Sequence, residues 1–264
     1  MSWTRGVVWP SILALVVLAS TSLAFAGPRH KSKAAAHPKK VAASSVGSPN
    51  EGKLVGGEKL EPSKCLRIVG ANTWGVPELT GLIERACEKV RKNHEAARLT
   101  VGDLSKKGGG DVGGHHSHES GRDVDLGFYL VDAKGNPKFA PRFAVIDEEG
   151  RAKGVPGARF DDAANWELVS ALVNDSDARV LQIFVANPLR SRLLAYAAKI
   201  GAPQKTRDRA ASLMLQPKKA LPHDNHFHVR IACPKSSKEC VDFATPTRKS
   251  VKAKGPQRRK RAGR

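Results

Sequence analysis

Residues 113–131 read GGHHSHESGRDVDLGFYLV, and this stretch indicates both the fold and the candidate site. Glycines at 108–110, 113 and 114 allow a sharply bent loop that ends at His118. Residues 122–131 read as a strand, with polar residues alternating at its start. Asp123 and Asp125 therefore share one strand face. Two acids facing a core need a partner, and a divalent cation is the natural one.

A second polar cluster, residues 222–230, reads PHDNHFHVR. In a strand over 226–232, His226 and His228 lie on one face and Phe227 on the other. One histidine can then bind a metal while its neighbour reaches the substrate. Two histidines and one carboxylate leave a fourth position for water, as in a catalytic zinc site.

The chain has nine histidines, and six of them fall into two tight groups. Either group alone could be a plain loop or a chance metal binder. Both together, with a suitably spaced acid, favour an active site. The groups are His115, His116 and His118, then His223, His226 and His228.

The remaining pattern predicts a mixed domain over residues 60–245, long enough to bury a core. Apolar spacing predicts helices over 77–98, 162–173 and 187–199, the last stopped by Gly201. Residues 179–185 read as a buried strand. Helices and strands mix without a βαβ rhythm, which favours an α+β fold.

Both ends of the chain read differently from this domain. Residues 1–26 have a charged start, an apolar run and an Ala24-Phe25-Ala26 ending, typical of a secretory signal peptide. A transmembrane anchor is the alternative, but Pro10 and the cleavage pattern favour processing. Residues 27–59 and 246–264 read as disordered basic segments, a linker and a tail.

The formal net charge of +20 lies mostly outside residues 61–245. This location and the predicted export weigh against a nucleic-acid partner. The basic segments could tether the protein to an anionic polymer or membrane surface. A solvated tail with no specific partner is an equal alternative.

Four cysteines in an exported chain predict disulfides. The sequence permits three pairings, of which we favour the local one, Cys65 with Cys87 and Cys233 with Cys240. A zinc site made of these thiols is disfavoured because the close C-x-x-C spacing is absent. No G-x-S-x-G motif is present, so a serine nucleophile has little support.

The spacing from His118 to Asp125, followed by His226-x-His228, resembles the LAS group of metallopeptidases. The chain is most similar to the penicillin-insensitive murein endopeptidases within that group, over residues 60–242. Shared stretches include residues 101–105, 108–110, 114–125, 179–196 and 222–230, and the Cys233/Cys240 pair resembles a family disulfide. The chain departs from the family in its four cysteines, His116 and basic extensions.

This resemblance implies a single LAS-type domain with a central antiparallel sheet flanked by helices. It implies Zn²⁺ on His118, Asp125 and His228, with His115 as a further residue able to approach the metal. His226 and His223 match active-site histidines, His226 the one that moves protons.

Two neighbouring polar residues are less certain from the pattern. Asp123 is a candidate to orient a ligand imidazole, with a solvent-facing or capping acid equally plausible. For Arg230 a surface salt bridge is the default, and binding of a substrate carboxylate the alternative.

The expected activity is hydrolysis of peptide crosslinks in peptidoglycan, in the periplasm. A D,D-carboxypeptidase or dipeptidase of the same group, or a non-catalytic wall-binding protein, are the alternatives. The oligomeric state is open.

Overall fold

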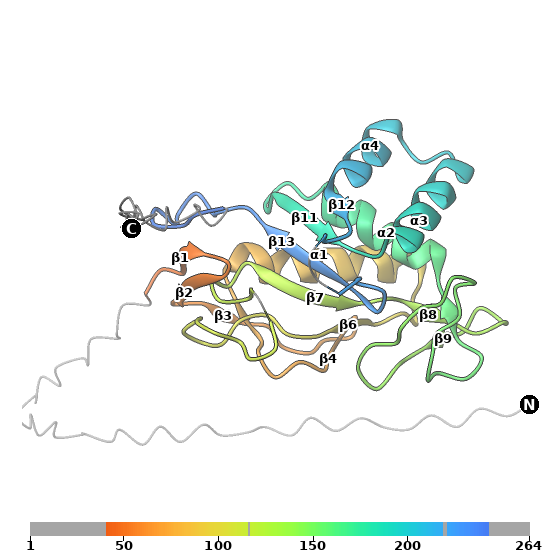
Figure 1. Cartoon of the computed structure of the whole chain (residues 1–264), viewed down its shortest axis with the longest axis horizontal. Helices are drawn as coiled ribbons and strands as arrows, with labels where there is room; N and C mark the ends of the chain where they lie inside the picture. The colour runs from red at the N-terminus through yellow and green to blue at the C-terminus, as the bar shows by residue number, and fades with distance from the viewer. Residues whose placement is uncertain (1–40, 116, 219–220, 243–264) are drawn as a thin grey trace, which may run out of the picture. The chain divides into compact units, whose positions relative to one another are not determined.

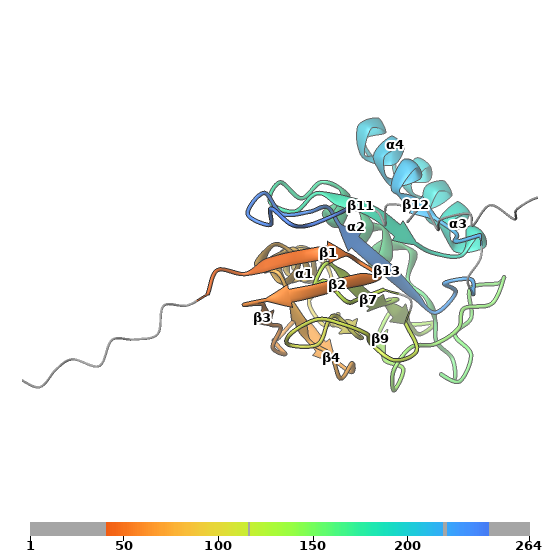
Figure 2. The same cartoon turned by 60° about the vertical axis from the view of Figure 1, so that its left-hand side comes forward.

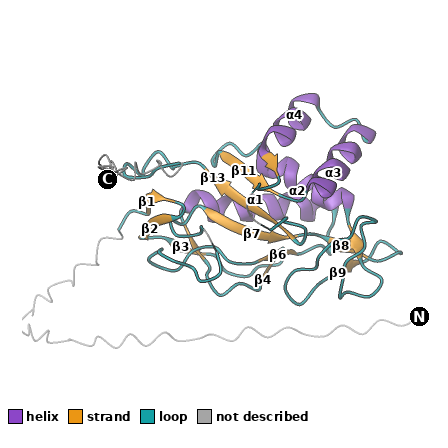
Figure 3. Ribbon diagram, in the orientation of Figure 1, coloured by secondary structure: helices purple, strands orange, loops and turns teal. Residues whose placement is uncertain are grey.

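A six-stranded sheet in the order β12-β11-β13-β7-β6-β4 forms the centre of the fold (Figures 1 and 3). The computed structural model describes residues 41–115, 117–218 and 221–242. The four inner strands are antiparallel, while β12 and β4 pair in parallel at the two edges. The strands are β4 (Leu66–Ile68), β6 (Leu99–Val101), β7 (Asp123–Gly127), β11 (Val180–Phe184), β12 (Met214–Leu215) and β13 (His226–Ile231).

The helices are α1 (Pro77–Asn93), α2 (Asp162–Val173), α3 (Asn187–Lys199) and α4 (Gln204–Leu213). Figure 1 shows α1 and α2 behind the sheet and α3 and α4 near β11 and β12. The Asp161 carboxylate starts α2 by accepting the backbone N–H groups of Ala163 and Ala164, each at 3.1 Å. The predicted α+β fold, with antiparallel strands at the centre of its sheet, is confirmed.

One helix prediction needs correction, and one helix was not predicted. The helix expected to reach Arg98 ends at Asn93, because His94 (φ −132°) leaves the helical region and the chain turns toward β6. Helix α4 was not predicted. Its surface is largely polar, with only Thr206 and Ala210 buried, so apolar periodicity could not reveal it.

Strands β7 and β13 form the central pair on which the predicted site lies. Their register places His228 opposite Asp125, Arg230 opposite Asp123, and His226 opposite Gly127. Between these polar positions, the alternate residues enter the core: Val124, Leu126, Phe227, Val229 and Ile231. The two-residue period thus separates a polar face from a core face.

The expected linker over residues 27–59 is wrong for its last part. Strands β1 (Ser44–Ser48) and β2 (Glu51–Val55) form a hairpin at the end of the sheet where β7 begins (Figure 2). The hairpin is rich in serine and glycine and shows no apolar alternation that would predict strands. It bonds to the backbone of a loop, where Leu54 N–H donates to Gly108 O at 3.1 Å. The Pro49-Asn50 turn is the signal that could have indicated it.

Arg122 ties this hairpin to the last described residues of the chain. Its guanidinium is fully buried and donates to Ser45 Oγ (3.0 Å), Asp242 Oδ1 (3.1 Å) and Val241 O (2.8 Å). The domain therefore begins before residue 60, and its two ends meet beside the start of β7.

Two smaller sheets lie at the periphery. β3 (Glu58–Lys59) pairs with β5 (Trp74–Gly75), and a second sheet has the order β10-β8-β9. Its strands are β8 (Leu130–Val131), β9 (Pro137–Lys138) and β10 (Arg159–Phe160). The strand predicted over 122–131 is thus divided between two sheets.

Both predicted disulfides, Cys65–Cys87 and Cys233–Cys240, are present. Among the described residues, no helix has the length and apolar character to cross a membrane. The predicted signal peptide, the linker before residue 41, His116 and the basic tail lie outside the described residues.

Candidate metal centre

The Asp125 carboxylate lies at the centre of four histidines. His228 Nδ1 is 3.0 Å from its Oδ1, and both His118 Nε2 and His226 Nε2 are 3.4 Å from the same atom. His115 Nδ1 lies 3.7 Å from Oδ2. Strands β7 and β13 and the loop before β7 thus bring both predicted histidine groups to one acid.

Burial alone would raise the pKa of Asp125. The contacts with His118, His226 and His228 outweigh that effect and hold its pKa well below the usual range. Asp125 is therefore a carboxylate, with the charge that a metal ligand requires.

His118 is held so that one ring nitrogen faces the site. Its φ of 75° is the one positive value at a non-glycine residue of the described chain, and the Ser105 hydroxyl donates to its carbonyl. Its Nδ1 lies 3.0 Å from Leu104 O, which can only accept, so Nδ1 carries the proton. The other ring nitrogen, Nε2, is buried and has no hydrogen-bond partner. A metal would supply the missing partner.

His228 lies between two carboxylates. Its Nε2 is 2.9 Å from Asp123 Oδ1, and its Nδ1 is the atom that faces Asp125. Burial lowers the pKa of His228, but the two carboxylates outweigh it and raise the pKa to about 9. Asp123 is fully buried against the His228 imidazole, which excludes a solvent-facing position for this acid.

Arg230 is not on the surface, so the expected surface salt bridge is wrong. Its side chain is buried, and its Nε donates to Asp123 Oδ1 at 2.6 Å. Burial raises the pKa of Asp123, but His228 and Arg230 outweigh it and lower the pKa to about 2. Strand register decides this contact, because Arg230 pairs with Asp123 across β7 and β13.

His226 and His223 lie side by side, with ring centres 4.9 Å apart. His226 stacks on Phe143, at 5.0 Å and 21°, and its Nδ1 is 2.6 Å from Asn225 Oδ1. Burial, followed by the neighbouring His226 and His228, lowers the pKa of His223 to about 4. His223 is therefore neutral near pH 7.

Asp103 and Arg142 belong to the site but were not assigned to it from sequence. His115 Nε2 lies 3.7 Å from Asp103 Oδ2, and Arg142 Nη2 donates to the same oxygen at 2.5 Å. The contact with His115, then bonds from Asn72 and the charge of Arg142, hold the pKa of Asp103 far below its usual range despite burial. Asp103 lies in the 101–105 motif, which was the available signal.

The donor atoms fit a metal ion. Ligand atoms of His115, His118 and Asp125 lie within 4.8 Å of one another. Imidazole nitrogens with one carboxylate suit zinc and other borderline metals better than Ca²⁺ or Mg²⁺. The fold thus presents, on an antiparallel strand pair and the loop before it, a histidine and carboxylate cluster able to hold a metal ion.

The comparisons with known proteins identify the family. The family model described as penicillin-insensitive murein endopeptidase matches residues 45–254, and the chain belongs to that family. It is 29% identical over 242 residues to the penicillin-insensitive murein endopeptidase of Escherichia coli O1:K1 / APEC, covering 89% of this chain and 82% of the relative. The enzyme of that name from Salmonella heidelberg (strain SL476) is 29% identical over 217 residues, covering 80% and 74%.

Proposed function

We propose that this protein is a zinc-dependent endopeptidase that hydrolyses peptide crosslinks of peptidoglycan in the periplasm. Family membership supports the substrate class. The observation that carries the chemistry is the buried, unpartnered Nε2 of His118 beside the Asp125 carboxylate. The predicted signal peptide supports the location, and the basic tail remains a candidate tether to the anionic cell envelope.

His118, Asp125 and His228 are the proposed zinc ligands. The three residues whose ligand atoms lie within 4.8 Å of one another are His115, His118 and Asp125. This group differs from the proposed ligands by one residue, His115 in place of His228. We favour His228 because it is buried and oriented by Asp123, whereas the side chain of His115 is 25% exposed and is drawn toward Asp103. His115 remains a residue able to approach the metal.

A bound zinc ion would supply Lewis acidity, which activates water and polarises the scissile carbonyl. His226 is placed to take the proton of the attacking water and return it to the leaving amine. Its stack on Phe143 fixes the ring, and its Nε2 faces Asp125. Neutral His223 beside it can donate a hydrogen bond to the developing oxyanion.

The test is digestion of crosslinked muropeptides by the zinc-loaded mature protein, with and without chelator. We expect conversion of dimers to monomers, abolished by chelator and by His228→Ala. His226→Ala should keep zinc and lose about 10²- to 10⁴-fold in kcat. His37→Ala, outside both histidine groups, is the control.

The products separate the alternatives. Loss of one terminal alanine would identify a carboxypeptidase instead. Binding to sacculi without release of fragments would identify a wall-binding protein. Full activity of His228→Ala would reject the ligand set.

A further inference from the structure

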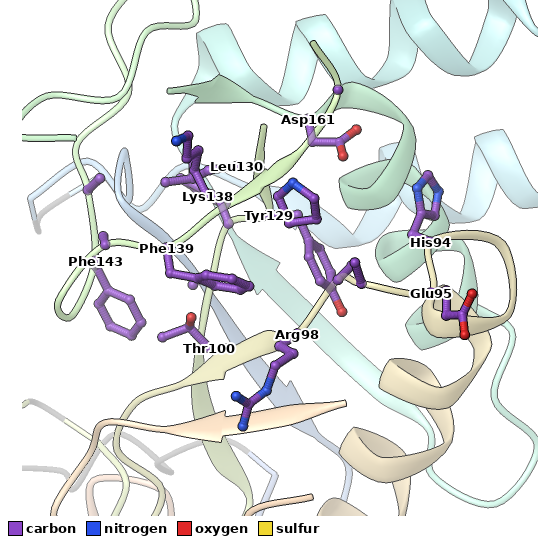
Figure 4. Close-up of a pocket in the computed structure, with 18 of the residues that line it drawn as sticks. His94, Glu95, Arg98, Thr100, Tyr129, Leu130, Lys138, Phe139, Phe143 and Asp161 are labelled. Atoms are coloured by element: carbon purple, nitrogen blue, oxygen red, sulfur yellow. The ribbon is translucent and has the colours of Figure 1, made fainter. Parts of the chain in front are cut away.

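Figure 4 shows a cavity of about 250 Å³. Its lining residues Phe143 and Arg142 contact His226 and Asp103 of the candidate metal centre. The end of α1, strand β6, the residues after β7 and the segment around β9 form its walls. Residues that the argument uses are Arg98, Gly127, Tyr129, Phe139 and Phe143. Neither the proposed zinc ligands nor the proposed proton-transfer histidine line it.

The cavity shares a wall with the catalytic histidine. Phe143 lines the cavity and stacks on His226. Gly127, which also lines the cavity, is the β7 residue paired with His226 in β13. A Cβ at Gly127 would lie 2.9 Å from Cδ1 of Phe143, so glycine lets the ring lie here. Phe143 and Gly127 therefore place the cavity next to His226.

Two arginines have no carboxylate partner within the described part of the chain: Arg98, which lines the cavity, and Arg67, which does not line it but lies against its wall residue Phe139. Arg98 donates to the neutral Leu66 carbonyl at 3.3 Å. Arg67 on β4 donates to Thr100 Oγ1 at 3.1 Å and to the carbonyls of Ala140 and Pro141. Its Nε is buried without a hydrogen-bond partner. Burial and the charge of Arg98 both lower the pKa of Arg67, so the two cations lie close enough to repel.

Aromatic side chains lie on the same cavity. Phe139 is 43% exposed, and the Arg67 guanidinium lies 5.7 Å from its ring centre. Tyr129 is 5% exposed. Figure 4 shows Phe139, Thr100 and Arg98 along one side, with the Glu95 carboxylate pointing away from the Arg98 guanidinium.

The acids of the cavity do not neutralise these arginines. Asp161 lies on the opposite side in Figure 4, and its carboxylate caps α2. A ligand with a carboxylate and an apolar body would relieve the repulsion between the arginines and cover Phe139.

We propose that this cavity is a substrate subsite for a carboxylate-bearing peptide arm of the crosslink, with the carboxylate at Arg98 and the body of the arm on Phe139. The subsite rests on the proposed function, since it extends the same active site. Peptide stems of the cell wall end in carboxylates, so this chemistry matches the substrate class.

The direct test is equilibrium binding of the tetrapeptide stem released from peptidoglycan to the full-length mature protein in chelator. Arg98→Gln should weaken binding about tenfold, the size of one charged hydrogen bond, and Arg98→Lys should restore part of it. The same peptide with its carboxylates converted to amides should bind wild type and Arg98→Gln equally. Arg209→Gln on α4, whose side chain has no described partner, is the matched control.

In the zinc-loaded protein, Arg98→Gln should raise KM for crosslinked dimers with little change in kcat. Equal stem binding by wild type and Arg98→Gln, with both variants folded, would overturn the subsite. If stem binding follows the expected pattern but no dimer is cleaved, the subsite stands and the endopeptidase proposal fails.

Discussion

The Ser105 hydroxyl positions the loop that carries His118, and removing it should cost both stability and metal affinity. Ser105 is fully buried; its hydroxyl donates to His118 O and accepts from Gly121 N at 3.0 Å. Ser105→Ala leaves a buried carbonyl and a buried N–H unpaired, at about 1–3 kcal/mol each. We expect a total loss of about 2–4 kcal/mol, because the loop can relax partly.

Thermal unfolding in chelator measures this loss without the metal. For a domain of this size, the expected fall in Tm is about 4–16 °C. Ser170→Ala, at a half-buried serine, is the control. No bond to the Ser170 hydroxyl is found within the described residues, so its effect should stay within about 0.5 kcal/mol.

Zinc titration then separates the loop from general stability. His118 held less firmly at φ 75° should bind zinc less tightly, so added zinc should raise the Tm of Ser105→Ala less than that of wild type. A Ser105→Ala protein as stable as the Ser170→Ala control, with the same zinc response, would refute the reasoning.

Three further substitutions test other contacts. Asp123→Asn removes the carboxylate that orients His228, so zinc affinity should fall about 10- to 100-fold in a competition titration with a chromophoric chelator. Arg122→Leu leaves the buried groups that Arg122 bonds without partners. The free energy of unfolding measured in urea should fall by about 3–5 kcal/mol, and a fall below about 1 kcal/mol would contradict this. Burial raises the pKa of Asp175, but Arg85 and backbone N–H groups outweigh it and lower that pKa. The contacts of Asp175 therefore stabilise the folded state at pH values above the pKa that Asp175 has in the unfolded chain. This stabilisation is lost as pH falls through the lower pKa that Asp175 has in the folded protein. Arg85→Gln should therefore lower the free energy of unfolding at pH 6, whereas near pH 2 the variant and wild type should be equally stable. A stability difference that does not change with pH would argue against the Arg85–Asp175 ion pair.

Part of the candidate site could be predicted because strand alternation is a local property. The alternation of Asp123 with Asp125, and of His226 with His228, follows from the strand period alone. Their grouping around one carboxylate required only that the two strands pair. Helix α2 and the two local disulfides were predictable for the same reason, since each depends on residues close in sequence.

Contacts between distant segments were not predictable in this way. The β1–β2 hairpin stabilises the histidine loop through backbone bonds, which leave no pattern in side-chain type. Asp103 joins His115 and Arg142 across 39 residues. Arg230 is buried because of its register against Asp123, which sequence spacing does not fix.

The sequence by itself determined that Asp123 and Asp125 share one strand face and that His226 and His228 share another, because side chains alternate with the period of a strand. Only the tertiary structure decided which nitrogen of His118 and His228 faces Asp125, and which neighbours hold those rings. The orientations of these rings depend on how the histidine loop, the β1–β2 hairpin and the central strands pack, and these segments are far apart in the chain. The same packing creates the cavity beside Phe143 that Arg98 lines.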